Sequence, residues 1–509
     1  MAKIAFVQQE MREYISTMLM SAKLKEAGHQ VEVFILPQEK GIYYYKKLYE
    51  YNPDIIGFSS TTISFADDLK ILKRILYPYV LNKKTKPFII FGGAHPTYNP
   101  EKVIKHNSID AICIGEGLDA IVELANKLDN EDDEWFLIEN LWIKNITHDY
   151  YKDHICRNPI RSISNINDWP RPDYALYYDK YEDLRNKPTK PAYIVRGCPY
   201  QCAFCYNPAF NEMYKEKCFY PENPDYAKRR IFQCMDVDKA ISEIKWLKET
   251  YGFTYLQFLS DNMTINKKWF KEFLEKYKKD IKITAVKKRY ITKYDSWTRS
   301  IYKTPQPFFM NCRANEVTKE IVDILKESGC NRVDFGVEHG NDFIRNDILN
   351  RNMSKEQIIQ CGKWFKEAGI RVQTTNIFGL PHEDFNKAWE SVELNRQFTP
   401  EISKACILQP FENTQIYNYA KENKLLKDNL QYSGTTYQIG VKDNRSEETK
   451  IKVKNEKQII KLSRLFDWFV KHPAIPKWIG FIICSLPFSY KQYYAKIFKE
   501  HGRKYKGIK

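Results

Sequence analysis

Three cysteines in one short stretch of the chain have a spacing typical of metal ligands. Cys198, Cys202 and Cys205 lie in the segment YIVRGCPYQCAFCYNPAF, separated by three and then two residues. Three thiolates suit a 4Fe-4S cube, in which one iron then has no protein ligand and can bind a substrate or cofactor. A structural zinc site normally has a fourth ligand, which Cys218 or Cys234 can supply. The sequence contains no second Cys-x-x-Cys pair, and this favours the cluster.

The segment around these cysteines begins a series of six predicted strand and helix units. The predicted strands lie near residues 192–196, 255–259, 309–312, 332–336, 371–378 and 402–408. Six such units predict a partial version of the eight-stranded α/β barrel, in which the loops after the strands form the functional face. The three cysteines follow the first predicted strand directly, so we expect them at the mouth of this barrel.

Polar or turn-forming residues follow the later strands of the series and are expected at the same mouth. They are Asp261 and Asn262 after the second strand, Arg313 after the third, Glu338 after the fourth, Gly379 after the fifth and Gln409 after the sixth.

The first 130 residues form a separate alternating series. Short apolar strands are predicted at residues 3–9, 31–35, 54–60, 87–93 and 109–115, with helices between them. Continuous apolar strands between helices imply a parallel sheet covered on both faces, which binds its ligand at the carboxyl ends of the strands. Glycines there let the backbone approach a ligand closely. The residues at those ends are Gly92, Gly93, His95 and Thr97, followed by Gly115, Glu116 and Gly117.

The motif RGCPYQCAFC resembles the Cys-x3-Cys-x2-Cys signature of radical S-adenosylmethionine (SAM) enzymes, with Phe204 in the aromatic position. The resemblance implies that the three cysteines hold a 4Fe-4S cluster whose fourth iron is chelated by SAM. Reductive cleavage of SAM then yields a 5′-deoxyadenosyl radical. The resemblance also implies a SAM site that includes Phe204, Asp261, Arg313, Glu338 and the turn at Gly379.

The segments IIFGGAHPTYNPE and DAICIGEGLDAIVEL resemble the cobalamin-binding domain that precedes one large subgroup of radical SAM enzymes. The resemblance covers residues 1–415 and implies that the strand-end residues of the first series contact cobalamin. The Asp-x-His-x-x-Gly motif of other cobalamin proteins is absent, because the loop after the first strand reads QQEMREY. We therefore expect cobalt without a histidine ligand, its lower face covered by residues 59–63 including Thr62. His95 is expected to line the pocket of the nucleotide tail.

The predicted fold class is α/β, with four regions along the chain. A doubly wound, flavodoxin-like cobalamin-binding domain is expected in residues 1–130 and a connector in 131–188. A radical SAM core built as a partial (βα)6 barrel is expected in residues 189–415, and a basic, mainly helical region in 416–509. Residues 281–307 form a basic and aromatic insertion, either a lid over the substrate or a solvated loop.

The net charge of +16 is concentrated near the C-terminus. From Ile451 onward there are fourteen Lys and Arg against three Asp and Glu. This region contains the apolar run WIGFIICSLPF, which is shorter than the roughly 20 residues that span a bilayer. The pattern fits peripheral contact with a membrane, or a buried helix with a basic face. Scattered cysteines and an N-terminus without a secretory signal predict a cytoplasmic protein.

The resemblance predicts a cobalamin-dependent radical SAM methyltransferase that acts at an unactivated carbon, with no catalytic residues beyond the cluster ligands. Its expected partners are a small-molecule or lipid-like substrate and an electron donor such as flavodoxin or ferredoxin, without nucleic acid. One alternative is a non-methylating member, such as an oxidative cyclase or ring-forming enzyme. An alternative of another class is a zinc-stapled, basic binding protein.

Overall fold

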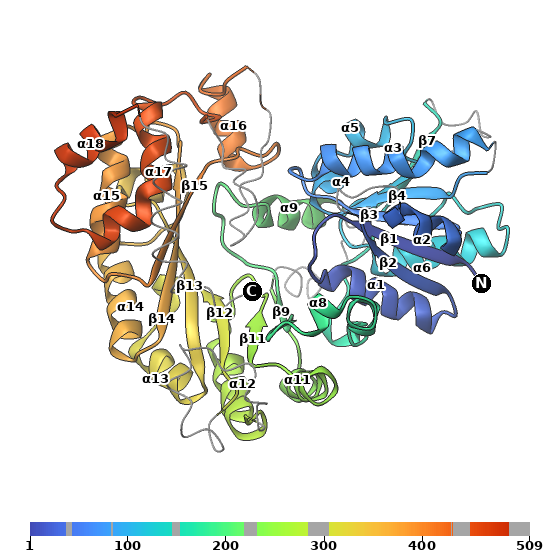
Figure 1. The fold of residues 1–509 in the computed structure, drawn as a ribbon, viewed down its shortest axis with the longest axis horizontal. Coiled ribbons are helices and arrows are strands. Elements are labelled where there is room, and N and C mark those ends of the chain that lie inside the picture. Colours follow the sequence, from blue (N-terminus) through green and yellow to red (C-terminus); the bar gives the residue numbers. More distant parts are fainter. Residues whose placement is uncertain are drawn as a thin grey trace.

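Figure 1 shows two α/β halves with helix α9 (Asn207–Lys217) between them. The structure is a computed structural model, and it describes residues 1–36, 43–82, 85–144, 153–217, 232–283, 305–428, 430 and 448–487. Cys218 and most of the insertion at 281–307 lie outside the described residues, as does the end of the basic C-terminal region.

The first half is the predicted doubly wound domain. Its sheet has the strand order β2-β1-β3-β4-β5-β6-β7, and the first five strands are parallel. Apolar side chains of α1 and α6 cover one face, and those of α2, α3 and α5 cover the other. The elements are β1 (Lys3–Gln8), α1 (Ile15–Glu26), β2 (Gln30–Ile35), α2 (Tyr43–Tyr51), β3 (Ile55–Ser59), α3 (Phe65–Leu81), β4 (Phe88–Gly92), α4 (Ala94–Tyr98), α5 (Pro100–Ile104), β5 (Ala111–Cys113) and α6 (Leu118–Asp129).

The sheet continues beyond residue 130, where the sequence ended the first domain. Strand β6 (Leu141–Lys144) pairs antiparallel with β5, and β7 (Ile155–Arg157) pairs antiparallel with β6. The parallel sheet predicted for residues 1–130 is confirmed, and the two antiparallel strands at this edge come from the segment predicted as a connector. The two added strands cover the backbone of β5, which would otherwise be an open sheet edge.

The rest of the predicted connector contacts both halves of the molecule. The hydroxyl of Tyr177, in α7 (Ala175–Tyr178), donates to Gln8 Oε1 of β1 at 2.6 Å. The hydroxyl of Tyr174 donates to the carbonyl of Pro191 at 2.9 Å. The connector thus helps to fix the first sheet against the second.

The second half contains the predicted partial barrel. Six parallel strands follow one another around the sheet in chain order. They are β8 (Thr189–Ala192), β11 (Tyr255–Phe258), β12 (Phe308–Cys312), β13 (Cys330–Glu338), β14 (Arg371–Phe378) and β15 (Ile402–Ile407). Their outer side is covered by α11 (Val237–Tyr251), α12 (Lys267–Asp280), α13 (Lys319–Glu327), α14 (Lys355–Glu367) and α15 (Phe385–Arg396).

The first barrel strand differs from the prediction. It is β8, whereas β9 (Val195–Arg196) pairs antiparallel with β10 (Gln233–Cys234) in a separate two-stranded sheet. The sequence analysis did not predict β8, because its sequence TKPA is polar and a buried lysine is unusual in a strand. Lys190 is buried there because its ammonium group donates to the carbonyls of Leu184 and Arg185 at 2.8 and 2.7 Å.

The described part of the C-terminal region is helical, as predicted, with α16 (Gln415–Glu422), α17 (Glu456–Lys471) and α18 (Lys477–Ser485). Helix α17 lies on the outer side of β15, where Asp467 accepts a hydrogen bond from the backbone of Ser403. Helix α18 buries Gly480 and Cys484 and exposes Trp478. Within the described residues, none of the helices has the length and apolar character that crossing a bilayer requires.

Candidate active site

The cysteine loop is held against the barrel by backbone hydrogen bonds. The amide of Ala203 donates to the carbonyl of Leu349, and the carbonyl of Ala203 accepts from the amide of Ile416, at 3.0 and 2.9 Å. Phe204, the predicted aromatic of the motif, is half-buried and packs against an apolar cluster at the barrel mouth that includes Ile344, Leu380 and Leu408. The loop is therefore fixed to the segments that follow three barrel strands, β13, β14 and β15.

The three thiols of this loop fit an iron-sulfur cluster. Cys202 is buried, while Cys198 and Cys205 are half-buried. Burial raises the pKa of Cys198 to about 11 and that of Cys205 to about 12, so ligation must displace their protons. The backbone N–H of Asn207 lies 3.4 Å from Cys205 Sγ, a donor of the kind that supports a ligated sulfur. Among the described residues, no three His, Cys, Asp or Glu side chains converge as ligands of a single metal ion.

Two arginines contact the sulfur of Cys202. Nη1 of Arg313 lies 3.4 Å from Sγ, and Nη1 of Arg351 lies 3.3 Å from it. The structure thus turns Arg313, which the resemblance assigns to SAM, towards Cys202, a predicted cluster ligand. Arg351 belongs to no motif in the sequence and was missed, because its loop reaches the cysteines only through the fold.

Glu338 lies beside these arginines at the end of β13. It is buried, has a φ of +62°, and places Oε1 3.9 Å from Nη2 of Arg351. A register shift between Gly336 and Glu338 marks an irregularity in the strand at this point. A Cβ at Gly336 would stand 1.8 Å from Glu338 Oε1, so only glycine leaves room for the carboxylate. Burial raises the pKa of Glu338, and the nearby arginines oppose this shift.

The turn at Gly379 is anchored by a buried carboxylate that the sequence did not reveal. Glu383 Oε2 accepts hydrogen bonds from the amides of Gly379 and Leu380 at 2.5 and 2.9 Å. Its Oε1 lies 2.9 Å from His339 Nε2, and both side chains are fully buried. Since His339 Nδ1 accepts from the amide of Asn341, Nε2 is the donor to Glu383. This pair joins the loops that follow β13 and β14.

Three strand-end residues remain, and they differ in their surroundings. The side chain of Asn262 donates to Glu316 Oε2 at 2.8 Å, so it is engaged by a protein group. Asp261 accepts hydrogen bonds from the backbone of Gly197 and the side chain of Asn207, and so ties the end of β11 to the cysteine loop. Gln409 is buried after β15, and its side-chain oxygen and nitrogen have no partner among the residues that the structure describes. A buried amide without partners is costly unless a ligand completes it. The barrel mouth therefore fits a polar ligand such as SAM.

The predicted cobalamin residues of the first half converge at the carboxyl edge of its sheet. Gly93 has a φ of +95°, and a Cβ there would stand 2.7 Å from the carbonyl oxygen of Ser60. Thr97 Oγ1 donates to the carbonyl of Gly93 and accepts from the amide of Gly115, at 2.8 and 3.0 Å. Gly92 is the last residue of β4 and is partly exposed. The backbone at this edge of the sheet is therefore accessible to a ligand.

Tyr206 brings the two predicted sites together. It follows Cys205 directly, and its hydroxyl lies 3.4 Å from Thr62 Oγ1. Thr62 Oγ1 lies in turn 3.2 Å from His95 Nδ1. The ring of Tyr206 stacks on that of Tyr98 in α4 at 4.0 Å between centroids. The cysteine loop thus adjoins the residues expected to cover cobalamin.

Glu116 is engaged by protein groups rather than turned towards a ligand. Its carboxylate pairs with Arg196 and accepts from the amide and hydroxyl of Ser164 at 2.8 and 3.0 Å. The hydroxyl of Tyr214, in α9, accepts from the amide of Glu116 at 3.0 Å and stands where a Cβ of Gly115 would lie. Gly117 precedes α6 and lies against Cys113. These contacts lock the first sheet to the segment that carries the cysteines.

His95 is expected to make folding stability depend on pH. Burial lowers its pKa from 6.5 to about 4, so the imidazole is neutral in the folded protein at pH 7. Between these values the unfolded chain binds more protons than the folded one, so stability falls as the pH falls from 6.5 towards 4. We expect His95→Gln to reduce this slope, measured as urea midpoints at pH 7.5, 6.0 and 5.0. Equal slopes in both proteins would contradict the assignment.

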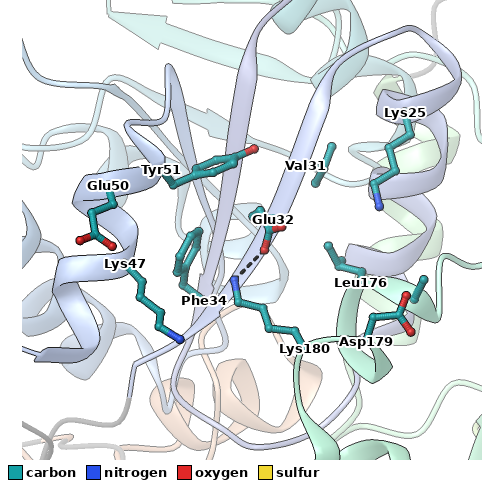
Figure 2. A pocket seen from close by; sticks show the side chains of 11 residues that line it. Lys25, Val31, Glu32, Phe34, Lys47, Glu50, Tyr51, Leu176, Asp179 and Lys180 are labelled. Carbon is teal, nitrogen blue, oxygen red and sulfur yellow. Dashed lines mark hydrogen bonds and ion pairs between the residues drawn. The ribbon is translucent and has the colours of Figure 1, made fainter.

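One open pocket lies elsewhere, at the edge strand β2. Figure 2 shows it between α2 and the segment around Leu176, where Lys180 pairs with Glu32 at 2.6 Å and lies over the ring of Phe34. None of the predicted site residues lines this pocket.

Two family models match the chain. The radical SAM superfamily matches residues 193–394, and the B12 binding domain matches residues 15–125. The first match contains the cysteine loop and the ends of four barrel strands, β11 to β14, and the second contains the strand ends assigned to cobalamin.

Several curated proteins are similar over most of the chain. An uncharacterized methyltransferase from Pyrococcus horikoshii is 25% identical over 387 residues, which cover 75% of this chain and 72% of that protein. The anaerobic magnesium-protoporphyrin IX monomethyl ester cyclase of Rubrivivax gelatinosus is 21% identical, covering 73% of this chain and 59% of the cyclase. The bacteriochlorophyllide d C-8(2)-methyltransferase of Chlorobaculum tepidum is 23% identical, with coverages of 74% and 70%.

Solved structures share the fold. The radical SAM methyltransferase TsrM from Kitasatospora setae, with tryptophan substrate and a SAM analog bound, has a TM-score of 0.61 and 15% identity, covering 86% of this chain and 79% of that one. The cobalamin-dependent SAM radical enzyme OxsB with aqua-cobalamin bound has a TM-score of 0.66 and 16% identity, with coverages of 99% and 76%.

Proposed function

The chain belongs to the radical SAM enzymes that carry an N-terminal cobalamin-binding domain, and from this premise we propose that it methylates an unactivated carbon. The observation that carries the proposal is the contact of Tyr206 with Thr62, which brings the cysteine loop beside the predicted cobalamin residues. Methyl transfer by this class needs both cofactors at one substrate. The names of two relatives, from Pyrococcus horikoshii and Chlorobaculum tepidum, also favour it.

The residues of this chain have distinct tasks in the proposed reaction. When bound, the cluster and SAM supply a 5′-deoxyadenosyl radical, and cobalamin supplies the methyl group. Cys198, Cys202 and Cys205 hold the cluster, and the buried Glu338 and Gln409 offer polar atoms to SAM at the barrel mouth. The stacked rings around Tyr206 are apolar surface that helps to exclude water from the region between the sites.

The distinguishing experiment uses anaerobically reconstituted enzyme with trideuteromethyl SAM, a low-potential reductant and small-molecule extract of the source cells. Methyl transfer predicts S-adenosylhomocysteine together with 5′-deoxyadenosine, and a new deuterium-labelled product in the extract. Formation of 5′-deoxyadenosine without S-adenosylhomocysteine or labelled product would overturn the proposal. That result would favour the second candidate, an oxidative cyclase type, which the cyclase relative supports.

The zinc-stapled binding protein is set aside, because the radical SAM model covers the cysteine loop.

The partners and location are further parts of the proposal. A flavodoxin or ferredoxin would supply electrons, the substrate would be a small or lipid-like molecule, and no nucleic acid is involved. A cytoplasmic location suits the free cysteines of the described residues.

Exposed Trp478 and Ile482, at 64% and 50%, support peripheral membrane contact through α18. Cosedimentation with anionic vesicles tests this contact, and a Trp478→Asp variant that sediments equally would contradict it.

A further inference from the structure

Two buried cations are directed at the same thiol. Cys202, Arg313 and Arg351 have exposed fractions of 6%, 4% and 7%. The two Nη1 atoms lie 3.4 and 3.3 Å from Cys202 Sγ. Hydrogen bonds from guanidinium groups are charge-assisted, and burial strengthens their electrostatic effect because little water screens them. The other two thiols are more exposed, and Cys205 has a neutral backbone donor instead.

Both guanidinium groups are held in place by several contacts. Arg313 lies 3.7 Å from the ring centre of Tyr200, and its Nε donates to Asn315 Oδ1 at 2.8 Å. Its Nη2 donates to the carbonyl of Arg351. Arg351 donates through Nη2 to the carbonyl of Gly336 at 2.8 Å. The geometry at the sulfur is therefore built into the barrel rather than adopted by mobile side chains.

The positive charges of Arg313 and Arg351 are not balanced unless a negative charge lies at the sulfur of Cys202. The two guanidinium groups repel each other, because both are positively charged and lie against the same sulfur, at 3.4 and 3.3 Å. Glu338 is the carboxylate that interacts with both arginines, at 3.9 Å from Arg351. Two buried cations beside one carboxylate leave a positive surplus, which is costly unless a further negative charge neutralises it. A thiolate that carries a cluster supplies that charge.

We propose that Arg313 and Arg351 raise the reduction potential of the 4Fe-4S cluster through the sulfur of Cys202. Reduction adds one electron to the cluster from a low-potential one-electron donor, and no proton moves because arginine stays protonated. The added negative charge is stabilised by adjacent cations and by hydrogen bonds to sulfur, which are known determinants of cluster potential. The proposal depends on the cluster alone and is independent of whether the enzyme methylates its substrate.

The test is a redox titration of the anaerobically reconstituted full chain without SAM, followed by electron paramagnetic resonance. We expect Arg351→Gln and Arg313→Gln each to lower the ratio of reduced to oxidised cluster about tenfold at the wild-type midpoint, a shift of about 59 mV for one electron. Arg351→Lys keeps the charge and should shift less. Glu338→Gln removes a negative charge and should raise the ratio, an opposite sign that a loss of packing does not produce.

The matched control is Arg332→Gln. Arg332 pairs with Asp334 at 2.8 Å on the same strand and makes the same charge change without a contact to Cys202. Its ratio should stay within about threefold of wild type. Ratios within threefold for both Arg351→Gln and Arg313→Gln would overturn the proposal, as would an equal shift in Arg332→Gln. If the Gln variants assemble no cluster, Glu338→Gln decides by the sign of its shift, and a ratio that falls or stays unchanged there would overturn the proposal.

Discussion

Replacement of any one of Cys198, Cys202 and Cys205 by Ala is expected to abolish the cluster and, with it, all cleavage of SAM. The three residues are the ligands predicted by the motif, and the radical SAM model includes them. A cluster held by two thiolates loses a third of its protein ligands and exposes a second iron to exchange. The expected iron content falls from about four per chain to below one, measured together with acid-labile sulfide and 5′-deoxyadenosine.

The control for these variants is Cys234→Ala. Cys234 is half-buried in β10, where its backbone pairs with Val195 close to the cysteine loop. It is also the described residue that the sequence offered as a fourth zinc ligand. The variant is expected to keep its iron, sulfide and SAM cleavage. Loss of the cluster in Cys234→Ala, or its retention in Cys205→Ala, would contradict the ligand assignment.

The sequence predicted the parts of this protein that local patterns determine. The strands of the first sheet are apolar runs, so β1 to β5 were found close to their observed positions. The cysteine motif is compact, and it was found by its spacing alone. Strand β8 was misplaced because Lys190 and Pro191 are uncommon in a buried strand. Lys190 is buried there because its ammonium group donates to the carbonyls of Leu184 and Arg185.

Residues that act through contacts distant in sequence could not be predicted. Arg351 reaches Cys202 across 149 residues, and His339 reaches Glu383 across 44. No spacing in the chain links such pairs, because their meeting depends on the curvature of the barrel. The roles assigned to Glu338 and Gly379 at the SAM site stay predictions, and Glu383→Ala tests the one assigned to the Gly379 turn.

The predicted cobalamin site and the predicted SAM site lie beside each other because of contacts between the first sheet and the barrel. Lys102 of α5 pairs with Glu412 after β15 at 2.5 Å, and the side chain of Asn413 donates to the carbonyl of Tyr98. Tyr206 also stacks on Phe411, with ring centres 5.5 Å apart. The end of the sixth barrel strand therefore lies against the carboxyl edge of the first sheet. This arrangement places the two predicted cofactor sites beside each other, which the proposed methyl transfer requires.

Glu383→Ala is expected to destabilise the fold and to weaken SAM binding together. Removal of the carboxylate leaves three buried donors without a partner, the amides of Gly379 and Leu380 and Nε2 of His339. Each buried unsatisfied donor costs about 1–3 kcal/mol, so we expect a loss of about 3 kcal/mol or more in the free energy of unfolding. Urea denaturation of the reconstituted protein measures this loss.

The effect on SAM follows from where the donors lie. The resemblance to radical SAM enzymes assigns the turn at Gly379 to the SAM site. The end of β13, which carries Glu338, is joined to this turn through His339 and Glu383. Loss of the contact between Glu383 and His339 should raise the dissociation constant for SAM about tenfold, which is about 1.4 kcal/mol of binding free energy. Titration calorimetry measures this change. Glu393→Ala, which removes an exposed carboxylate from the same helix region, is the matched control and should change neither quantity. If Glu383→Ala lost stability but bound SAM with wild-type affinity, the pair would support the barrel core without positioning the SAM loops.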